Sequence, residues 1–149
     1  MSLAPLIFLV ILMLPTPQAQ PVIVHVTTSD AVDLARLIAK EEGYDVRDTK
    51  VYYFDLLQTQ DGKPLLTGYT SIGFYINGNI RSSISISETT GQTIDMNSCE
   101  VFDYPDLKPF QERIVHLSKA KRKTAQELAD DAGCSSPKVL TEPVSLVGR

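Results

Sequence analysis

A chain of 149 residues with 43% hydrophobic and 21% charged residues has the composition of a folded protein rather than of a disordered one. Its length suits a single hydrophobic core. The net charge of −4 gives no general attraction to nucleic acid or to an anionic lipid surface, so we expect neither as a partner.

The chain begins with a run of nine apolar residues, 6–14, which is followed by a Pro-rich polar stretch, 15–21. A membrane-spanning helix needs about 20 apolar residues, whereas a signal-peptide core has the length of this run. We therefore predict a signal peptide, 1–19, with cleavage after Ala19. The mature protein would be exported to the periplasm or the extracellular space, and the membrane would be involved only in export. The alternatives are a buried N-terminal strand and an uncleaved anchor.

Helix and strand patterns alternate over the next part of the chain. A β-branched run at 22–26 precedes helix-capping residues at 27–30, and apolar residues at helical spacing predict a helix over about 30–42 that Gly43 ends. Residues 51–57 are rich in aromatic and β-branched side chains and predict a strand, which is followed by turn residues at 61–64.

Three further strands are predicted at 69–76, 80–87 and 92–96. Their aliphatic and phenylalanine positions are Ile72, Phe74, Ile76, Ile80, Ile84, Ile86, Ile94 and Met96. All of these residues share one face of the sheet if both hairpins close through three-residue loops, 77–79 and 89–91. A loop shorter by one residue would shift the register and move the side chains of the following strand to the other face. The opposite face would then be the wet one, and it would carry Tyr69, Tyr75, Arg81, Ser83 and Ser85.

A helical extension is predicted after the strands. Apolar spacing indicates a helix over about 107–118, and the basic cluster 119–123 is interpreted as a solvated loop. The capping-box spacing of 124–127 predicts a second short helix that ends at Gly133, and we expect the tail from Ser135 to be irregular. The predicted organisation is thus a signal peptide (1–19), an α+β domain (20–105), and a C-terminal helical extension with an irregular tail (106–149).

The two cysteines, Cys99 and Cys134, lie 35 positions apart. In an exported chain an even number of cysteines favours a disulfide, and two free buried thiols are the alternative. Neither cysteine belongs to a C-x-x-C motif, and the two histidines, His25 and His116, are far apart. The sequence therefore predicts no metal site and no cofactor.

The segment from about residue 22 to residue 103 resembles the PepSY family of small exported domains. The residues that carry this resemblance are 31–43 in the helix, and 80–86 with Thr90-Gly91-Gln92-Thr93-Ile94 in the closing hairpin. The aromatic stretch 44–57 and the cysteine-containing extension depart from the family pattern. The resemblance implies a cystatin-like fold and a non-catalytic domain that inhibits or restrains a peptidase outside the cytoplasm, with no catalytic residue carried over.

Tyrosines at 52, 53, 69 and 75 are candidates for an aromatic patch that contacts a partner peptide or a sugar. If the wet face of the sheet is uncovered, Tyr69 and Tyr75 would lie beside Ser83 and Ser85 as a binding surface. Packing beneath the C-terminal helices is the alternative that we leave open for these residues.

Two other functions are alternatives for this sequence. A small hydrolase would require an undetected pocket, with Asp55, His116 or a cysteine as its catalytic group. A DNA-binding protein would use residues 124–139, whose alanine, glycine and valine have the spacing of a helix-turn-helix motif. Export and the acidic charge balance argue against DNA.

The sequence therefore predicts an α+β protein in which one helix packs on a curved antiparallel sheet of about four strands, with a C-terminal helical extension. We expect a non-catalytic exported module, not an enzyme. It would bind a protein or peptide, for which a peptidase is the candidate, through the exposed face or edge of the sheet.

Overall fold

The structure is a computed structural model that describes residues 17–143. Residues 1–16 of the predicted signal peptide lie outside this range, so the prediction is not tested there. No helix within 17–143 is both long enough and apolar enough to cross a membrane. The described elements are α1 (Thr28–Glu41), β1 (Tyr52–Leu56), β2 (Tyr69–Ile76), β3 (Asn79–Ser87), β4 (Thr93–Asp95), β5 (Glu100–Phe102), a 3₁₀ turn (Pro105–Leu107), α2 (Lys108–Ser118), α3 (Ala125–Asp131) and β6 (Lys138–Leu140).

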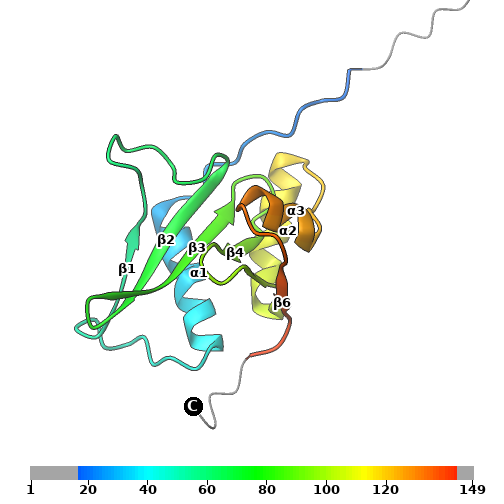
Figure 1. The fold of residues 1–149 in the computed structure, drawn as a ribbon. Coiled ribbons are helices and arrows are strands. Elements are labelled where there is room, and N and C mark those ends of the chain that lie inside the picture. Colours follow the sequence, from blue (N-terminus) through cyan, green and yellow to red (C-terminus); the bar gives the residue numbers. More distant parts are fainter. Residues whose placement is uncertain (1–16, 144–149) are drawn as a thin grey trace, which may run out of the picture.

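The strands form one six-stranded sheet in the order β1-β2-β3-β4-β5-β6 (Figure 1). Each pair of neighbours is antiparallel except β5 and β6, which are parallel. The predicted α+β class and the helix on the sheet are confirmed, but the predicted sheet of about four antiparallel strands is wrong. The two extra strands, β5 and β6, have three residues each, which is too short for a period-2 pattern to be visible. β6 lies in the tail that was expected to be irregular.

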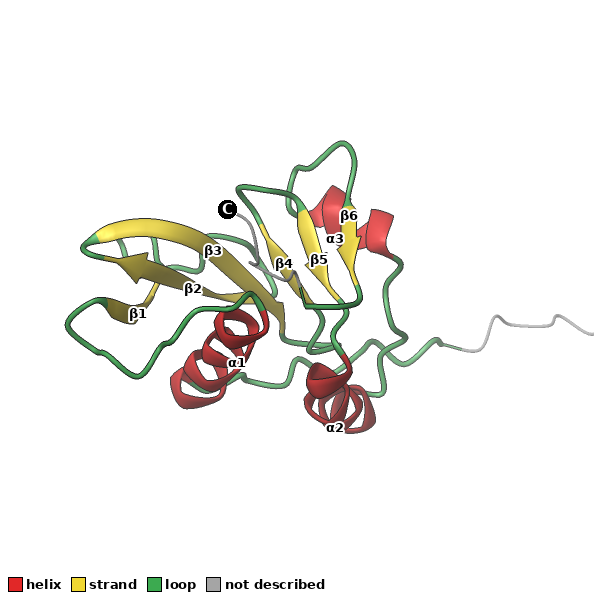
Figure 2. Ribbon diagram, turned by 90° about the horizontal axis from the view of Figure 1, so that it is seen from below, coloured by secondary structure: helices red, strands yellow, loops and turns green. Residues whose placement is uncertain are grey.

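Helices α1 and α2 cover one face of the sheet, and α3 lies on the other face near β5 and β6 (Figure 2). The side chain of Thr27 caps α1 by accepting a hydrogen bond from the backbone N–H of Asp30. One face of α1 packs on the sheet, and the first core cluster includes Ala31, Leu34, Ala35, Ile38, Ile72, Ile84, Ile86, Phe102, Tyr104 and Leu107. Burial of these apolar side chains is the main force that holds the helix on the sheet.

The β2–β3 hairpin combines a two-residue turn with a bulge. Asn77 and Gly78 both have positive φ, of 50° and 80°, which is the geometry of a two-residue hairpin turn. Ile80 therefore pairs with Tyr75, but Ser82 pairs with Phe74, so that Arg81 is the extra residue. The predicted three-residue loop is wrong. The bulge corrects the register after the turn and keeps Ile84 and Ile86 in the core, whereas Ile80 lies on the opposite face and is 49% exposed.

The β3–β4 connection also differs from the prediction, because Ile86 pairs with Thr93 and Ser85 pairs with Ile94. Ile94 consequently lies on the face opposite to Ile86. There it joins a second core cluster that includes Tyr69, Ile94, Val101, Leu128, Ala129 and Cys134. Gly91 has a φ of 67°, which lies in the left-handed region that glycine adopts without steric cost.

The predicted disulfide is confirmed: Cys99 and Cys134 are bonded, with their Cα atoms 5.8 Å apart. The bond joins the end of α3 to the connection between β4 and β5. The predicted capping box is also present, since Thr124 and Glu127 exchange hydrogen bonds at the start of α3. Together these features fix α3 over the second core cluster.

Candidate protein-binding surface

Three of the five residues predicted on a wet sheet face are buried. The exposed fractions are 2% for Tyr69, 6% for Ser83 and 0% for Ser85. The hydroxyl groups of Ser71 and Ser85 lie 2.7 Å apart, and Asn97 Nδ2 donates to Ser83 Oγ at 3.1 Å. Of the two alternatives for these residues, the covered face is the one found, because the second core cluster, with α3, and the β4–β5 turn lie over this part of the sheet.

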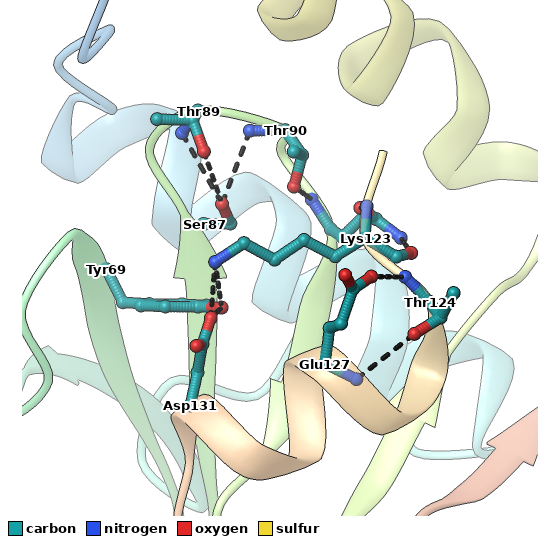
Figure 3. A network of polar contacts seen from close by, with 9 residues as sticks. Tyr69, Ser87, Thr89, Thr90, Lys123, Thr124, Glu127 and Asp131 are labelled. Atoms are coloured by element: carbon teal, nitrogen blue, oxygen red, sulfur yellow. Dashed lines mark hydrogen bonds and ion pairs between the residues drawn. The ribbon is translucent and has the colours of Figure 1, made fainter. Parts of the chain in front are cut away.

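Tyr69 belongs to a polar network that fastens α3 to the sheet (Figure 3). Its hydroxyl donates to Asp131 Oδ2 at 2.5 Å, and Lys123 Nζ donates to the same carboxylate oxygen. Lys123 Nζ also lies 5.3 Å from the centre of the Tyr69 ring. Burial and the hydrogen bond to Asp131 raise the pKa of Tyr69 well above its usual value. Burial raises the pKa of Asp131, but the hydrogen bonds from Lys123 and Tyr69 outweigh it and lower that pKa overall.

Arg81, the fourth predicted residue, is exposed but does not lie beside Tyr75. It is the bulged residue of β3, and its Nε donates to the hydroxyl of Tyr44 at 2.8 Å. Tyr44 follows α1, so this contact directs Arg81 to the helix-covered side of the sheet. The bulge explains the error, since alternation along a strand fails at the residue that has no partner.

Tyr75, the fifth predicted residue, is half-buried at the sheet surface in a row across three strands. Tyr53, Tyr75 and Ile80 are directly paired on β1, β2 and β3, and we call them the tyrosine patch. The rings of Tyr53 and Tyr75 are stacked, with centroids 4.6 Å apart and planes at 2°. Tyr53 is 41% exposed and Ile80 is 49% exposed. Large apolar side chains therefore share the part of the face that α3 leaves open.

Gly73 allows the Tyr75 ring to lie close to the sheet. A Cβ atom at position 73 would come within 2.7 Å of Cε2 of Tyr75, so the ring occupies the space that a side chain would fill. Asp55 pairs with Gly73 and is exposed, which places a carboxylate next to the tyrosine patch. The resulting surface is aromatic with an acidic neighbour.

The tyrosine patch adjoins one edge of the sheet, because β1 is the first strand in the sheet order and no other strand of residues 17–143 pairs with its outer side. The N–H of Leu57 donates to Ser71 and the carbonyl of Val51 accepts from Asn77, each at 2.8 Å. In the antiparallel pattern the backbone groups of residues 53 and 55 then face β2, and those of 52, 54 and 56 face outward. The N–H of residue 52 is used locally by Asp48, so the outward N–H groups at this edge are those of Phe54 and Leu56.

The residues considered for a hydrolase are not brought together. Both cysteines form the disulfide. Asp55 lies on the open face of β1, whereas His116 is exposed on α2, which covers the other face (Figure 2). Within residues 17–143 there is no group of three acidic, histidine or cysteine side chains that could hold a metal ion.

The helix-turn-helix prediction is wrong. Such a motif requires a second helix after Gly133, but the chain there forms the disulfide at Cys134 and then strand β6, which pairs with β5. Only the first part of residues 124–139 is helical: it forms α3, which packs on the second core cluster.

No known protein family matches the sequence, and neither does any curated protein. A similar chain occurs in a solved structure of a type VI secretion system effector–immunity complex from Pseudomonas protegens. The two chains superpose with a TM-score of 0.64 and are 24% identical over 74% of this chain and 91% of that chain. At this level of identity the similarity shows a shared fold.

Proposed function

We propose that this protein is an exported, non-catalytic module that binds another secreted protein through the tyrosine patch and the neighbouring edge of β1. The observation that carries the proposal is the stacked pair Tyr53–Tyr75 beside the outward backbone groups of Phe54 and Leu56. A partner can bury the aromatic rings and continue the sheet in one contact.

Aromatic side chains that are held rigidly at a surface are the residues that contribute most to protein–protein binding. The patch meets this condition, because stacking and the close approach to Gly73 hold the Tyr75 ring in place. A peptide strand added to β1 would gain backbone hydrogen bonds, and its side chains on the open face would lie beside Tyr53.

Two findings support the class of partner and the compartment. The similar solved chain belongs to a type VI secretion system effector–immunity complex, so a chain of this fold occurs in a protein complex of a secretion system. The Cys99–Cys134 disulfide is suited to an oxidising compartment, in agreement with the apolar run 6–14. In the finer form of the proposal, the partner is a peptidase that the module restrains, as the PepSY resemblance implies.

The test starts from mature protein, 20–149, immobilised and exposed to the exported proteins of the producing cells, with the captured protein identified by mass spectrometry. Its Kd is then measured for the wild type and for the double variant Tyr53→Ser/Ile80→Ser. We expect a loss of affinity of at least about tenfold, because both side chains belong to the proposed contact. The matched control is Leu117→Ser, which removes an equally exposed apolar side chain from α2.

The edge is tested separately with Leu56→Pro, which removes an outward N–H while leaving the β2 hydrogen bonds of its neighbours in place. Leu56→Ala is the control for the lost side chain. Equal affinity for the wild type, the double variant and Leu56→Pro would refute the proposed surface. Hydrolysis of peptides by the captured protein, measured with and without the module, tests the peptidase form, and an unchanged rate would contradict it.

A further inference from the structure

A second concave site lies away from the tyrosine patch, at the end of the sheet that β5 and β6 form, and residues of both α2 and α3 line it. It is a pocket of about 260 Å³ between β5, β6, the start of α2 and the α2–α3 linker. Its lining includes Val101, Phe102, Lys108, Gln111, Arg122 and Val139, and we call it the α2–β5 pocket.

The polar wall of the α2–β5 pocket carries more positive than negative charge. Asp103 is paired with Lys108, and Arg122 Nη2 lies 3.8 Å from the same carboxylate oxygen. One acid therefore faces two cations. Lys123 also lines the pocket, but its ammonium group pairs with Asp131 in the network that fastens α3. A guanidinium has five N–H donors, so the pairing of Arg122 leaves donors for a further acceptor.

Gln111 fixes Arg122 and adds another unsatisfied donor. Its side chain is fully buried, and its Oε1 accepts a hydrogen bond from Arg122 Nη2 at 2.6 Å. This contact sets the orientation of the amide. Its Nε2 then has no hydrogen-bond partner among the described residues. Buried amide groups are nearly always paired, so the unpaired Nε2 is an unusual feature of the side chain that holds Arg122.

Apolar residues of the two last strands also line the pocket. Val101 and Phe102 of β5 are 5% and 1% exposed, whereas Val139 of β6, which pairs with Val101, is 46% exposed. An apolar group that enters the pocket would cover part of the exposed surface of Val139. The pocket thus combines apolar residues with cationic donors.

We propose that the α2–β5 pocket binds a carboxylate that is attached to a short apolar body. Arg122 and Lys108 receive the carboxylate, Gln111 positions Arg122, and Val101 and Val139 contact the apolar part. A planar guanidinium matches a carboxylate with two parallel hydrogen bonds. The ligand that supplies this carboxylate is either a free small acid or the C-terminal residue of a polypeptide, since both can carry a carboxylate on an apolar group.

The proposal is tested by titrating the mature protein with 3-methylbutanoate, acetate, N-acetyl-leucine and N-acetyl-leucinamide. Binding is measured from the NMR chemical shifts of the Gln111 side-chain amide. We expect saturable binding of both branched acids, at least about fivefold tighter than acetate, because their methyl groups are buried. The amide, which has the shape of N-acetyl-leucine without its charge, should not bind. Tighter binding of N-acetyl-leucine than of 3-methylbutanoate would identify a polypeptide terminus, and the reverse order would identify a small acid.

Two variants test whether Arg122 binds the carboxylate. Arg122→Gln should weaken binding by at least about tenfold, whereas Lys121→Gln removes the same charge from an exposed neighbour outside the pocket and should not. If Arg122→Gln does not fold, as judged by circular dichroism, Lys108→Gln at the rim serves in its place. Absence of saturable binding at millimolar concentrations, or equal weakening by the pocket variant and Lys121→Gln, would overturn the proposal.

Discussion

Tyr53 and Tyr75 stack in parallel on neighbouring strands, on the part of the sheet face that α3 leaves open. The arrangement depends on Gly73, over which the Tyr75 ring lies. The pair is therefore set in place by the backbone beneath it, and its orientation can be changed without altering either tyrosine.

We predict that Gly73→Ala displaces the Tyr75 ring and weakens partner binding while the fold persists. The new Cβ would lie 2.7 Å from Cε2 of Tyr75, and the ring is half-buried, so it can turn outward. The free energy of unfolding should change by less than about 1 kcal/mol, since alanine also suits a strand better than glycine does. Near-ultraviolet circular dichroism reports the ring, and urea titration reports stability. An unchanged tyrosine signal would contradict this prediction.

The Tyr69–Asp131 hydrogen bond should make a measurable contribution to stability. Tyr69→Phe removes the donor from a buried ring and leaves Asp131 with Lys123 alone, so we expect a loss of about 1.5–3 kcal/mol, as for hydrogen bonds to charged groups. Thermal unfolding of the wild type and of Tyr69→Phe at neutral pH measures this loss of stability. Tyr53→Phe is the matched control, because Tyr53 is exposed and makes no hydrogen bond within the described residues through its hydroxyl. Equal losses in both variants would show that the network contributes nothing specific.

Glu42 should make the protein less stable as the pH rises. Burial, Glu100 and Asp95 raise the pKa of Glu42 to about 7, against the opposing charges of Arg81 and Lys138. The folded state then holds a proton that the unfolded state releases near pH 4.5, so the stabilising effect is complete below about pH 4.5 and is lost as the pH rises to about 7. Urea unfolding at pH 5 and pH 7.5 measures the change.

The control for this pH dependence is Glu42→Gln, which cannot titrate. The variant should be more stable than the wild type at pH 7.5, and it should lose less stability than the wild type between the two pH values. Identical pH dependence of the two proteins would exclude Glu42 as the cause.

Deletion of Arg81 and Arg81→Ala should both leave a folded protein. Without the bulged residue, Ser82 would follow Ile80 directly and still pair with Phe74, so Ile84 and Ile86 would stay in the core cluster that packs against α1. Alanine keeps the bulge and removes only the contact with Tyr44. Cooperative unfolding observed by circular dichroism checks both variants, and loss of cooperative unfolding in the deletion variant alone would refute this account of the hairpin.

The parts of the fold that could be predicted from the sequence are those with strong local patterns. Residues 28–41 and 52–56 show helical and strand periodicity, and the capping box of α3 is visible in four residues. The bulge at Arg81 leaves no such pattern, because the same residues also allow a three-residue turn without a bulge. β5 and β6 are too short to show alternation.

The burial of Ser83 and Ser85 could not be predicted from strand alternation, since a serine-rich face is typical of a strand surface that meets water. It depends on the covering of that face by segments distant in the sequence. One signal was available: the predicted bond between Cys99 and Cys134 requires the end of α3 to lie against the β4–β5 connection. With Leu128 and Ala129 as apolar residues of α3, that constraint points to a second covered face.

The sheet order has a consequence for the timing of folding. Strands β1 to β5 are neighbours in the same order in space and in sequence, so each can pair as soon as the next one is made. β6 is different: it joins parallel to β5 after α2 and α3, and it starts at Lys138, near the end of the chain. We therefore expect a meander that forms early and a parallel closing strand that forms last, with oxidation of Cys99 and Cys134 holding that late strand near its place.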